Sequence, residues 1–203
     1  MASKISTKQL TYWLGKFGDD YTQRNSNMKL FAKRRKFFKN ILKKLNVESI
    51  LEIGCNNAAN LVQIKKINSS LKVVGLEPNK KAVAIAKNLI PDAKIIRASV
   101  FALSIKNVYD FVFTAGVLIH IADKDLEKAL SKIFNASKHY ILAVEYYSPK
   151  RKTIPYRDLT DALFKRPYAK EYLDLFPTLK IIAKGKLGKG DGFDNCKFWL
   201  FEK

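Results

Sequence analysis

The chain has 203 residues, which is enough for one sizeable hydrophobic core and too few for two comfortable domains. A hydrophobic fraction of 47% and an aromatic fraction of 12% indicate a folded globular protein and exclude a largely disordered one. The net charge of +20 attracts anions, nucleic acid included. The sequence contains no run of the roughly 18 apolar residues that a membrane span needs, so we expect a cytoplasmic protein without one.

The basic residues are mostly Lys and are scattered along the chain. A nucleic-acid groove more often has Arg and aromatic residues in one localised stripe. A compositional bias toward Lys explains the charge equally well, so nucleic acid stays an alternative partner. We expect Cys55 and Cys196 to be free thiols. Together with His120 and His139 they have no metal-ligand spacing, and no metal site is predicted.

The N-terminal part of the chain, residues 1–46, has no strand signal. Apolar residues recur at helical spacing through "NMKLFAKRRKFFKNILKKL", with Lys and Arg on the opposite face. This pattern predicts one amphipathic helix that docks on the rest of the protein. We expect a single domain over 1–203, with an N-terminal helical lid at 1–46 and a Rossmann-like core at 47–203.

From residue 47 onward, apolar strands alternate with helical patterns. Strands that are buried on both faces and separated by helices indicate a parallel, doubly wound sheet. Asp123 is the predicted N-cap of the third helix in this region. The expected strands are 49–53, 71–77, 93–98, 109–114 and 139–145, and the expected helices cover 61–66, 82–90 and 126–134.

The last third of the chain has a different pattern. A helix is predicted to begin near Pro167, which suits a first helical position. Two further strands, 179–185 and 196–202, are joined by the Gly-rich "GKLGKGDG" and predict a hairpin that gives the sheet an antiparallel edge. The fold class expected from the sequence is therefore α/β, with a doubly wound, Rossmann-like sheet of seven strands.

The first strand-to-helix turn, "ILEIGCNNAAN" at 50–60, lies where a doubly wound sheet binds its ligand. It lacks the G-x-G-x-x-G motif of dinucleotide-binding turns, which argues against NAD. Glu77 ends the next strand, 23 residues after Gly54, and suits a carboxylate that accepts hydrogen bonds from both ribose hydroxyls of a nucleoside. The sequence therefore predicts an adenosine ligand without a pyrophosphate.

These features resemble the class I S-adenosylmethionine-dependent methyltransferases. The matching segments are "LEIGCNNAAN", "GLEPN", "ASVFAL" and "YDFVFTAGVLIHI". The resemblance implies S-adenosyl-L-methionine as the cofactor and S-adenosyl-L-homocysteine as its product. Asn56 and Asn57 tolerate left-handed backbone dihedrals better than most residues, so we expect them to replace the missing glycines of the first turn.

A narrower resemblance covers nearly the whole chain. The segments "YWLGKFGDDYTQRN", "FTAGVLIHI" and "YILAVEYYSPKRKTIPYRDLTDALFKRPYA" look like the group named pseudaminic acid biosynthesis-associated methylases. The name of this group reports an association with a bacterial surface nonulosonic sugar and does not establish the methyl acceptor.

The family resemblance also implies roles for individual residues around the cofactor. Glu52 and Gly54 would shape the loop, and Glu77 would hold the ribose. Trp13 and Arg24 would belong to a lid, with Arg24 paired to the methionine carboxylate or to an acidic sugar. The alternative is that "WLGKFGDDY" only packs against the sheet. The predicted cofactor-binding residues are Trp13, Tyr21, Arg24, Glu52, Gly54, Cys55, Asn56, Asn60, Glu77, Pro78, Ser99, Val100, Thr114 and Ala115.

Three residues are candidates for catalysis: His120, Tyr21 and Tyr146. His120 follows the fourth strand and could serve as the base for methyl transfer to a hydroxyl. The alternative is that it only bonds a loop carbonyl. Residues beyond the fifth strand lie on the ligand edge of the sheet, where we expect the acceptor pocket, unless the aromatic residues there only pack under the loop. The predicted acceptor-binding residues are Glu145, Tyr146, Tyr147, Tyr156 and Arg157.

The leading functional hypothesis is a small-molecule methyltransferase that acts on an oxygen or nitrogen of an acceptor such as a nonulosonic acid or a nucleotide-linked sugar. One alternative is an RNA or protein methyltransferase that uses the basic surface. Another is a non-catalytic protein that binds the cofactor or a partner. The run "KRRK" at 33–36 is expected to be a solvated helix face, with binding of RNA phosphates as its alternative.

Overall fold

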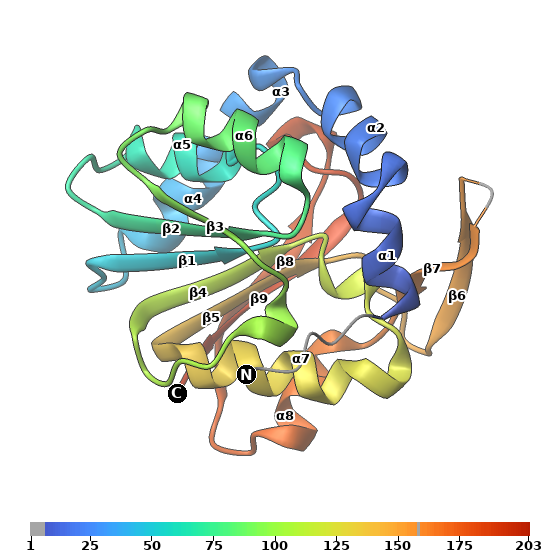
Figure 1. The fold of residues 1–203 in the computed structure, drawn as a ribbon. Helices are drawn as coiled ribbons and strands as arrows, with labels where there is room; N and C mark the ends of the chain where they lie inside the picture. The colour runs from blue at the N-terminus through green and yellow to red at the C-terminus, as the bar shows by residue number, and fades with distance from the viewer. Residues whose placement is uncertain (1–6, 158) are drawn as a thin grey trace.

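The computed structural model describes residues 7–157 and 159–203. In this part of the chain, a seven-stranded sheet with the order β3-β2-β1-β4-β5-β9-β8 forms the centre of the molecule (Figure 1). Its strands are β1 (Ser49–Ile53), β2 (Lys72–Glu77), β3 (Lys94–Arg97), β4 (Tyr109–Ala115), β5 (Ser137–Glu145), β8 (Lys180–Leu187) and β9 (Cys196–Glu202).

The first five of these strands are parallel, and β9 is inserted antiparallel between β5 and β8. The strand order reverses between β1 and β4, because β2 pairs with one side of β1 and β4 with the other. The carboxyl ends of these two strands therefore form the switch point where doubly wound sheets bind ligands. The seven-stranded sheet and its antiparallel C-terminal hairpin confirm the fold predicted from the sequence.

Helices cover both faces of the sheet (Figure 1). The central strand β4 shows why, since Phe111 and Phe113 pack toward the α4–α6 side while Val112 packs toward the α7–α8 side. Alternate side chains of a strand point to opposite faces, so a strand with a continuous apolar run needs a cover on each. The helices are α4 (Arg34–Leu42), α5 (Ala59–Lys65), α6 (Lys80–Leu89), α7 (Asp123–Ala136) and α8 (Tyr168–Leu175), with the short 3-10 helices η1 (Val100–Ala102), η2 (Leu118–His120) and η3 (Lys189–Asp191).

Two predicted helix starts are wrong by one residue. Asp123 is the first residue of α7 and Ala122 is the N-cap, without a side-chain hydrogen bond. The Asp123 carboxylate instead binds Arg151 and Arg166. Pro167 is the N-cap of α8 and not its first helical residue. Both differences arise because side-chain type constrains a helix start only to within a residue or two.

The N-terminal segment forms several short helices where the sequence predicted one long helix. These are α1 (Lys8–Leu14), α2 (Lys16–Arg24), α3 (Met28–Ala32) and then α4. The predicted helix is interrupted at Lys33, and Leu30 is 56% exposed although its spacing placed it on the apolar face. The α4 part of the prediction is confirmed, because Phe38 and Ile41 are buried against the sheet.

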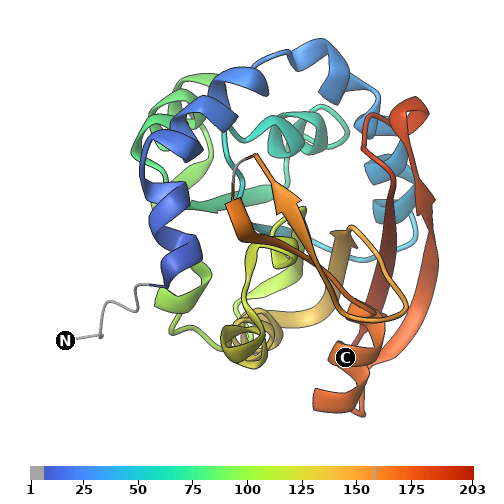
Figure 2. The same cartoon turned by 90° about the vertical axis from the view of Figure 1, so that its right-hand side faces the viewer.

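A second, two-stranded sheet was not predicted. It consists of β6 (Lys152–Tyr156) and β7 (Leu159–Lys165), which pair antiparallel. Figures 1 and 2 show this β6–β7 hairpin projecting from the main sheet on the side where α1 and α2 lie. The alternation of β6 is weak, with every residue at least partly exposed and Pro155 within it, which explains why the sequence pattern did not reveal the strand.

None of the helices that the structure describes is long and apolar enough to cross a membrane.

Candidate active site

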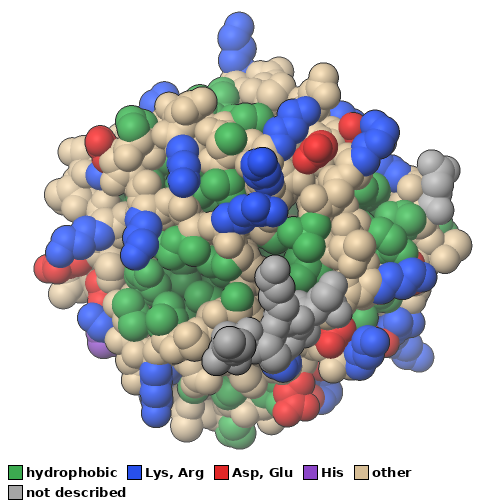
Figure 3. All heavy atoms as spheres, viewed as in Figure 1, with side chains coloured by type: hydrophobic (Ala, Val, Ile, Leu, Met, Phe, Trp, Pro, Cys, Tyr) green, Lys and Arg blue, Asp and Glu red, His purple; other side chains and the backbone are tan. Residues whose placement is uncertain are grey.

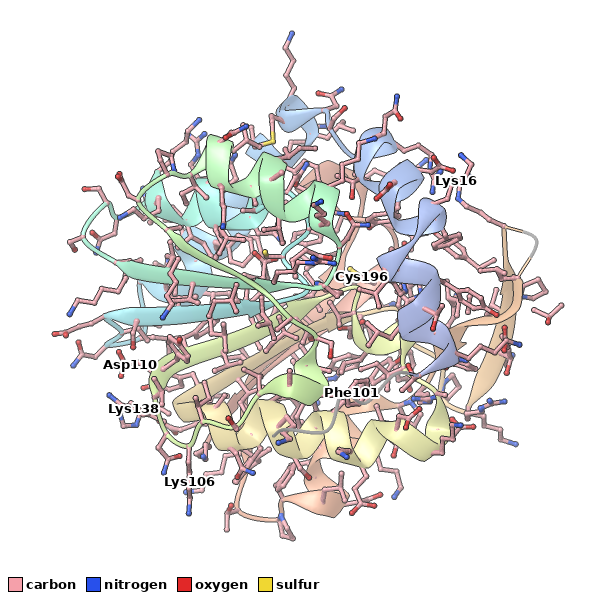
Figure 4. The ribbon with its side chains drawn as sticks, viewed as in Figure 1. Lys16, Phe101, Lys106, Asp110, Lys138 and Cys196 are labelled. Carbon is pink, nitrogen blue, oxygen red and sulfur yellow. The ribbon has the colours of Figure 1, made fainter. Side chains whose placement is uncertain are left out.

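A cavity of about 200 Å³ lies at the carboxyl ends of the parallel strands, at the switch point between β1 and β4. We call it the inner cavity. Figure 4 places Cys196, which lines it, at the opposite end of the sheet from Asp110 and Lys138. The inner cavity is bounded by the turns after β1, β2, β3 and β4, by the end of β5, and by α1 and α2.

The turn after β1 adopts a left-handed backbone at Gly54, Asn56 and Ala58, with φ of 69°, 48° and 61°. The prediction that asparagine replaces glycine is confirmed at Asn56 but is wrong at Asn57, since Ala58 takes the second such position. A Cβ atom at Gly54 would lie 2.5 Å from Cγ2 of Val117, so no larger residue fits at this position of the turn. Ala58 is fully buried as the N-cap of α5.

Asn57 connects this turn to the N-terminal segment. Its side-chain amide donates to the carbonyl of Asn25 at 3.0 Å, and its side-chain oxygen accepts from the N–H of Ala59 at 3.2 Å. The turn after β1 is therefore hydrogen-bonded to the segment that follows α2.

Glu77 ends β2 with a buried carboxylate. Oε2 accepts from the N–H of Asn56 and Oε1 from the N–H of Asn79, each at 2.8 Å. Burial raises the pKa of Glu77 to about 7, while the hydrogen bonds from Asn79 and Asn56 lower it. Each oxygen keeps a lone pair, so the carboxylate can accept two further hydrogen bonds from a ligand in the cavity.

Glu52 lies in β1 and is 1% exposed. Its Oε1 accepts from the amide of Asn60 at 2.6 Å, and Asn60 Oδ1 in turn accepts from Arg34 at 2.9 Å. Arg34 also donates to the carbonyl of Gly192 at 2.8 Å. Burial raises the pKa of Glu52 to about 8, whereas the Asn60 hydrogen bond and the Arg34 charge lower it. A buried carboxyl group and a cation thus lie at one end of the inner cavity.

Two buried polar atoms of the cavity wall have no partner among the residues that the structure describes. They are Oε2 of Glu52 and Oδ1 of Asn56. Buried polar groups are nearly always hydrogen-bonded, so these two atoms are available to a ligand in the cavity. A ligand with an ammonium group and hydroxyls would satisfy them.

The wall formed by the turns after β2 and β3 is more apolar. Pro78, Ser99 and Val100 line it as predicted, and Phe101 lines it in addition. Figure 4 shows Phe101 on η1, at the side of the sheet facing α7. This wall suits a flat aromatic ring more than a charged group.

Glu145 lines the inner cavity but its carboxylate is already engaged. Oε1 accepts from the N–H groups of Val117 and Leu118 at 3.2 Å, and Oε2 from that of Ile119 at 3.4 Å. Burial raises its pKa to about 7 and these backbone bonds lower it. Glu145 therefore holds η2 in place, and its predicted role as an acceptor-binding residue is not supported by its contacts.

His120 lies at the end of η2, half-buried between two cavities. Its Nδ1 is 2.6 Å from the carbonyl oxygen of Ala162. A carbonyl only accepts, so Nδ1 carries the proton and Nε2 presents a lone pair. Burial lowers the pKa of His120 to about 4, and the ring is therefore neutral at pH 7. The hydrogen bond to a carbonyl agrees with the second sequence-based alternative, and His120 also lines the cavity. Its role as a base stays a prediction.

A second cavity of about 310 Å³, the outer cavity, adjoins the first. The two share a wall formed by Tyr21, Asn25, Gly116, His120, Tyr146 and Asp194.

Tyr146 is held within this shared wall by its hydroxyl, which donates to Asp194 at 2.6 Å. Burial and this bond raise the pKa of Tyr146. Burial also raises the pKa of Tyr21 to about 12, so both phenols stay protonated at neutral pH.

The two cavities are covered by α1, α2 and the β6–β7 hairpin, which we call the cover. Asp161 of β7 joins its two parts: it forms an ion pair with Lys8 at 2.8 Å and accepts from the hydroxyl of Tyr12 at 3.2 Å. Trp13 of α1 packs on His120, with ring centroids 4.5 Å apart. Segments at distant places in the sequence therefore close over one site.

Comparison with known proteins agrees with this geometry. A family model described as a methyltransferase domain matches residues 50–139, which include the first turn, Glu77 and His120. No curated protein sequence matches the chain. Among solved structures, a 1,6-didemethyltoxoflavin-N1-methyltransferase from Burkholderia thailandensis has a TM-score of 0.74 at 9% identity, over 100% of this chain and 93% of that one. That structure contains 1,6-didemethyltoxoflavin and S-adenosylhomocysteine.

The chain shares its fold with methyltransferases of known structure. A magnesium protoporphyrin IX methyltransferase from Synechocystis, with bound S-adenosylhomocysteine, has a TM-score of 0.71 at 14% identity, over 96% of this chain and 99% of that one. A SAM-dependent methyltransferase from Leishmania major has a TM-score of 0.71 at 16% identity, over 96% of this chain and 81% of that one.

On this methyltransferase fold, most of the predicted site residues come together. Arg24 lines only the outer cavity, although it was predicted to bind the cofactor. Thr114 and Tyr147 line neither cavity. Tyr147 instead packs on Trp199 and Lys197. The predicted residues that line the inner cavity are Trp13, Tyr21, Glu52, Gly54, Cys55, Asn56, Asn60, Glu77, Pro78, Ser99, Val100, Ala115, His120, Glu145 and Tyr146; those of the outer cavity are Tyr21, Arg24, His120, Tyr146, Tyr156 and Arg157.

Several residues of the candidate site were missed. Arg34 belongs to the "KRRK" run that was expected to be a solvated face, yet Arg34 points into the inner cavity and Arg35 donates to Gln63. The signal that could have separated them from their neighbours is their place on the same side of α4 as the apolar residues. Asp194 lies in a Gly-rich turn, where the sequence offers no signal for a site residue.

Proposed function

We propose that the protein is an S-adenosylmethionine-dependent methyltransferase that acts on a small molecule. The observation that supports this proposal is the set of polar groups in the inner cavity. Glu77 has a carboxyl group placed to accept hydrogen bonds from a ribose, and Glu52 has a buried oxygen without a partner among the described residues. Both lie beside the first turn of a fold shared with methyltransferases. Each polar part of S-adenosylmethionine has a matching group there.

The amino-acid part of the cofactor fits the end of the inner cavity at Glu52 and Arg34. Glu52 Oε2 would accept from the ammonium group, and the guanidinium of Arg34 would bind the carboxylate. Arg34 takes the role that the sequence resemblance suggested for Arg24, since Arg24 does not reach the inner cavity wall. The ribose would bind Glu77, and the adenine would lie against Val100 and Phe101.

When bound, the cofactor supplies a methyl group on a positively charged sulfur, which makes that carbon electrophilic. The protein contributes by holding the acceptor in line with it and by excluding water. The cover performs the second task through Trp13, which closes the site above His120. For a hydroxyl acceptor, Nε2 of His120 would accept the hydrogen bond of the hydroxyl group and would take up its proton.

The side chains of Tyr21 and Tyr146 act as positioning groups in this scheme. Both stay protonated at neutral pH, so neither serves as a base. Tyr146 is held by Asp194 and presents its ring to the shared wall of the two cavities.

The resemblance to the pseudaminic acid-associated methylases suggests a nonulosonic acid or a nucleotide-linked sugar as the acceptor. Aromatic faces at Tyr146 and Tyr156 suit a sugar ring. The alternative of RNA methylation has less support, because the Lys and Arg residues are scattered along the sequence. On the one face that Figure 3 shows, their side chains do not gather in one stripe.

The test is calorimetric titration with S-adenosylmethionine and S-adenosylhomocysteine. We expect binding to the wild-type protein and a loss of roughly 100-fold in affinity in Glu77→Ala, because both ribose hydroxyls lose a charged acceptor. The control variant is Glu127→Ala, which removes an exposed carboxylate from α7 and should bind as the wild type does. No binding to the wild type would overturn the proposal and favour the non-catalytic alternative.

A further inference from the structure

The outer cavity differs in charge from the inner one. Its wall contains Arg24 from α2 and Arg157 from the end of β6, and the single carboxylate among its described lining residues, Asp194, accepts from Tyr146. Two cations therefore face a cavity in which the one anion is already hydrogen-bonded.

Among the described residues, neither of these arginines forms an ion pair. Both residues are exposed. Arg34, Arg35 and Arg166, by contrast, each donate hydrogen bonds to other residues. Arginine presents a planar fork of donors that matches a carboxylate or phosphate.

The two ends of the outer cavity are lined by different residues. His120, with the lone pair of Nε2, and Tyr21 lie where the outer cavity meets the inner one. Arg24 and Arg157 line the outer cavity only. A molecule that fills the outer cavity with one end at His120 therefore has its other part beside the two arginines.

We propose that the outer cavity binds an anionic acceptor, a hydroxylated small molecule whose carboxylate or phosphate is held by Arg24 and Arg157 while the group to be methylated lies toward His120. This inference rests on the proposed methyltransferase function, since it assigns the acceptor class of the same site. Tyr156 supports the arrangement, because its ring packs on His120 with centroids 5.7 Å apart and beneath the guanidinium of Arg157 at 5.9 Å.

The first test measures binding by saturation-transfer NMR on the full chain saturated with S-adenosylhomocysteine. The probes are N-acetylneuraminate and glucuronate, each against its own methyl ester, so that the members of a pair differ chiefly in charge. We expect the carboxylates to bind and the esters to bind roughly 10-fold more weakly, with inorganic phosphate competing for the same site. Equal binding of acid and ester, or no binding of either acid, would overturn the proposal.

The second test locates the anion site by mutation. The double variant Arg24→Gln with Arg157→Gln should abolish the preference for acid over ester. Lys72→Gln with Lys106→Gln removes the same charge from exposed positions at the opposite end of the sheet and should leave that preference intact. An equal loss of preference in both double variants would mean that net charge, and not this cavity, attracts the anion, and would overturn the assignment.

The two proposals fail in different ways. Titration of S-adenosylhomocysteine into the Arg24→Gln, Arg157→Gln variant should give the wild-type affinity, since neither residue lines the inner cavity. A loss of this affinity would contradict the division into two subsites. Failure of the wild type to bind S-adenosylhomocysteine would instead remove the proposed function, whatever the anion probes do.

Discussion

The floor and the cover of the site are built in contrasting ways. The floor consists of strand ends and tight turns whose polar groups are almost fully buried, as at Glu52 and Glu77. The cover consists of short helices and a hairpin that meet through exposed polar contacts at Asp161. Breaking buried polar contacts costs much free energy, so they hold one geometry. Exposed ion pairs contribute little free energy and break readily. The floor therefore suits a common cofactor, and the cover suits exchange and choice of acceptor.

The sharpest way to break the floor is Gly54→Ala. The new Cβ would meet Val117 at 2.5 Å, on a residue whose φ is 69°. We expect a loss of about 3 kcal/mol in the free energy of unfolding, from backbone strain and overpacking together, and a loss of cofactor binding. Urea unfolding and calorimetry measure the two effects. The control is Gly190→Ala, where a Cβ has no neighbour within 4 Å; equal destabilisation of both variants would contradict the prediction.

The proposed role of Arg34 in binding the cofactor is tested by comparing Arg34→Met with Arg35→Met. Arg34 lines the inner cavity, while its neighbour Arg35 donates to Gln63 outside it. We expect the dissociation constant for S-adenosylhomocysteine to rise roughly 30-fold in the first variant and to change less than about 3-fold in the second. If Arg35→Met weakened binding as much, the loss would reflect the stability of α4 and not contact with the ligand.

The buried carboxyls of the floor predict how stability depends on pH. Burial raises the pKa of Glu52 to about 8 and of Glu77 to about 7, from an ordinary value of 4.5. Between these values the unfolded chain binds fewer protons than the native protein, so the free energy of unfolding falls as the pH rises from about 5 to about 8. Urea unfolding without cofactor measures this slope. Glu52→Gln should flatten it, and a stability that rises over this interval would contradict the raised pKa values.

The smallest effect is expected in the cover. Asp161→Asn removes the charge that pairs with Lys8, while the backbone carbonyl of Asp161 still accepts from Gln9. We expect the cofactor to dissociate about 2- to 5-fold faster in stopped-flow measurements, with unchanged unfolding, because exposed ion pairs contribute little stability. Asp20→Asn, which breaks an exposed pair with Lys16 on α2, is the matched control. An equal change in both would show that Asp161 does not join the two parts of the cover.

The strands and the position of Glu77 could be predicted from the sequence alone. Apolar runs such as 109–114 become strands because both faces of a central strand must be buried, and the alternation with helices imposes parallel pairing. The acid that ends the second strand then lies at the ligand edge by topology. These conclusions depend on short segments of sequence and on the rule that ligands bind at the carboxyl ends of the strands in a doubly wound sheet. Neither requires knowledge of contacts between distant segments.

Other features were decided only by the tertiary structure. Arg34 turns inward because Asn60 and Gly192, both remote in sequence, accept its hydrogen bonds. Glu145 accepts backbone hydrogen bonds from η2, and the left-handed position falls on Ala58 where Asn57 was expected. In each case the outcome depends on which groups from distant segments compete for the same partner or the same space, and a linear pattern carries no record of that competition.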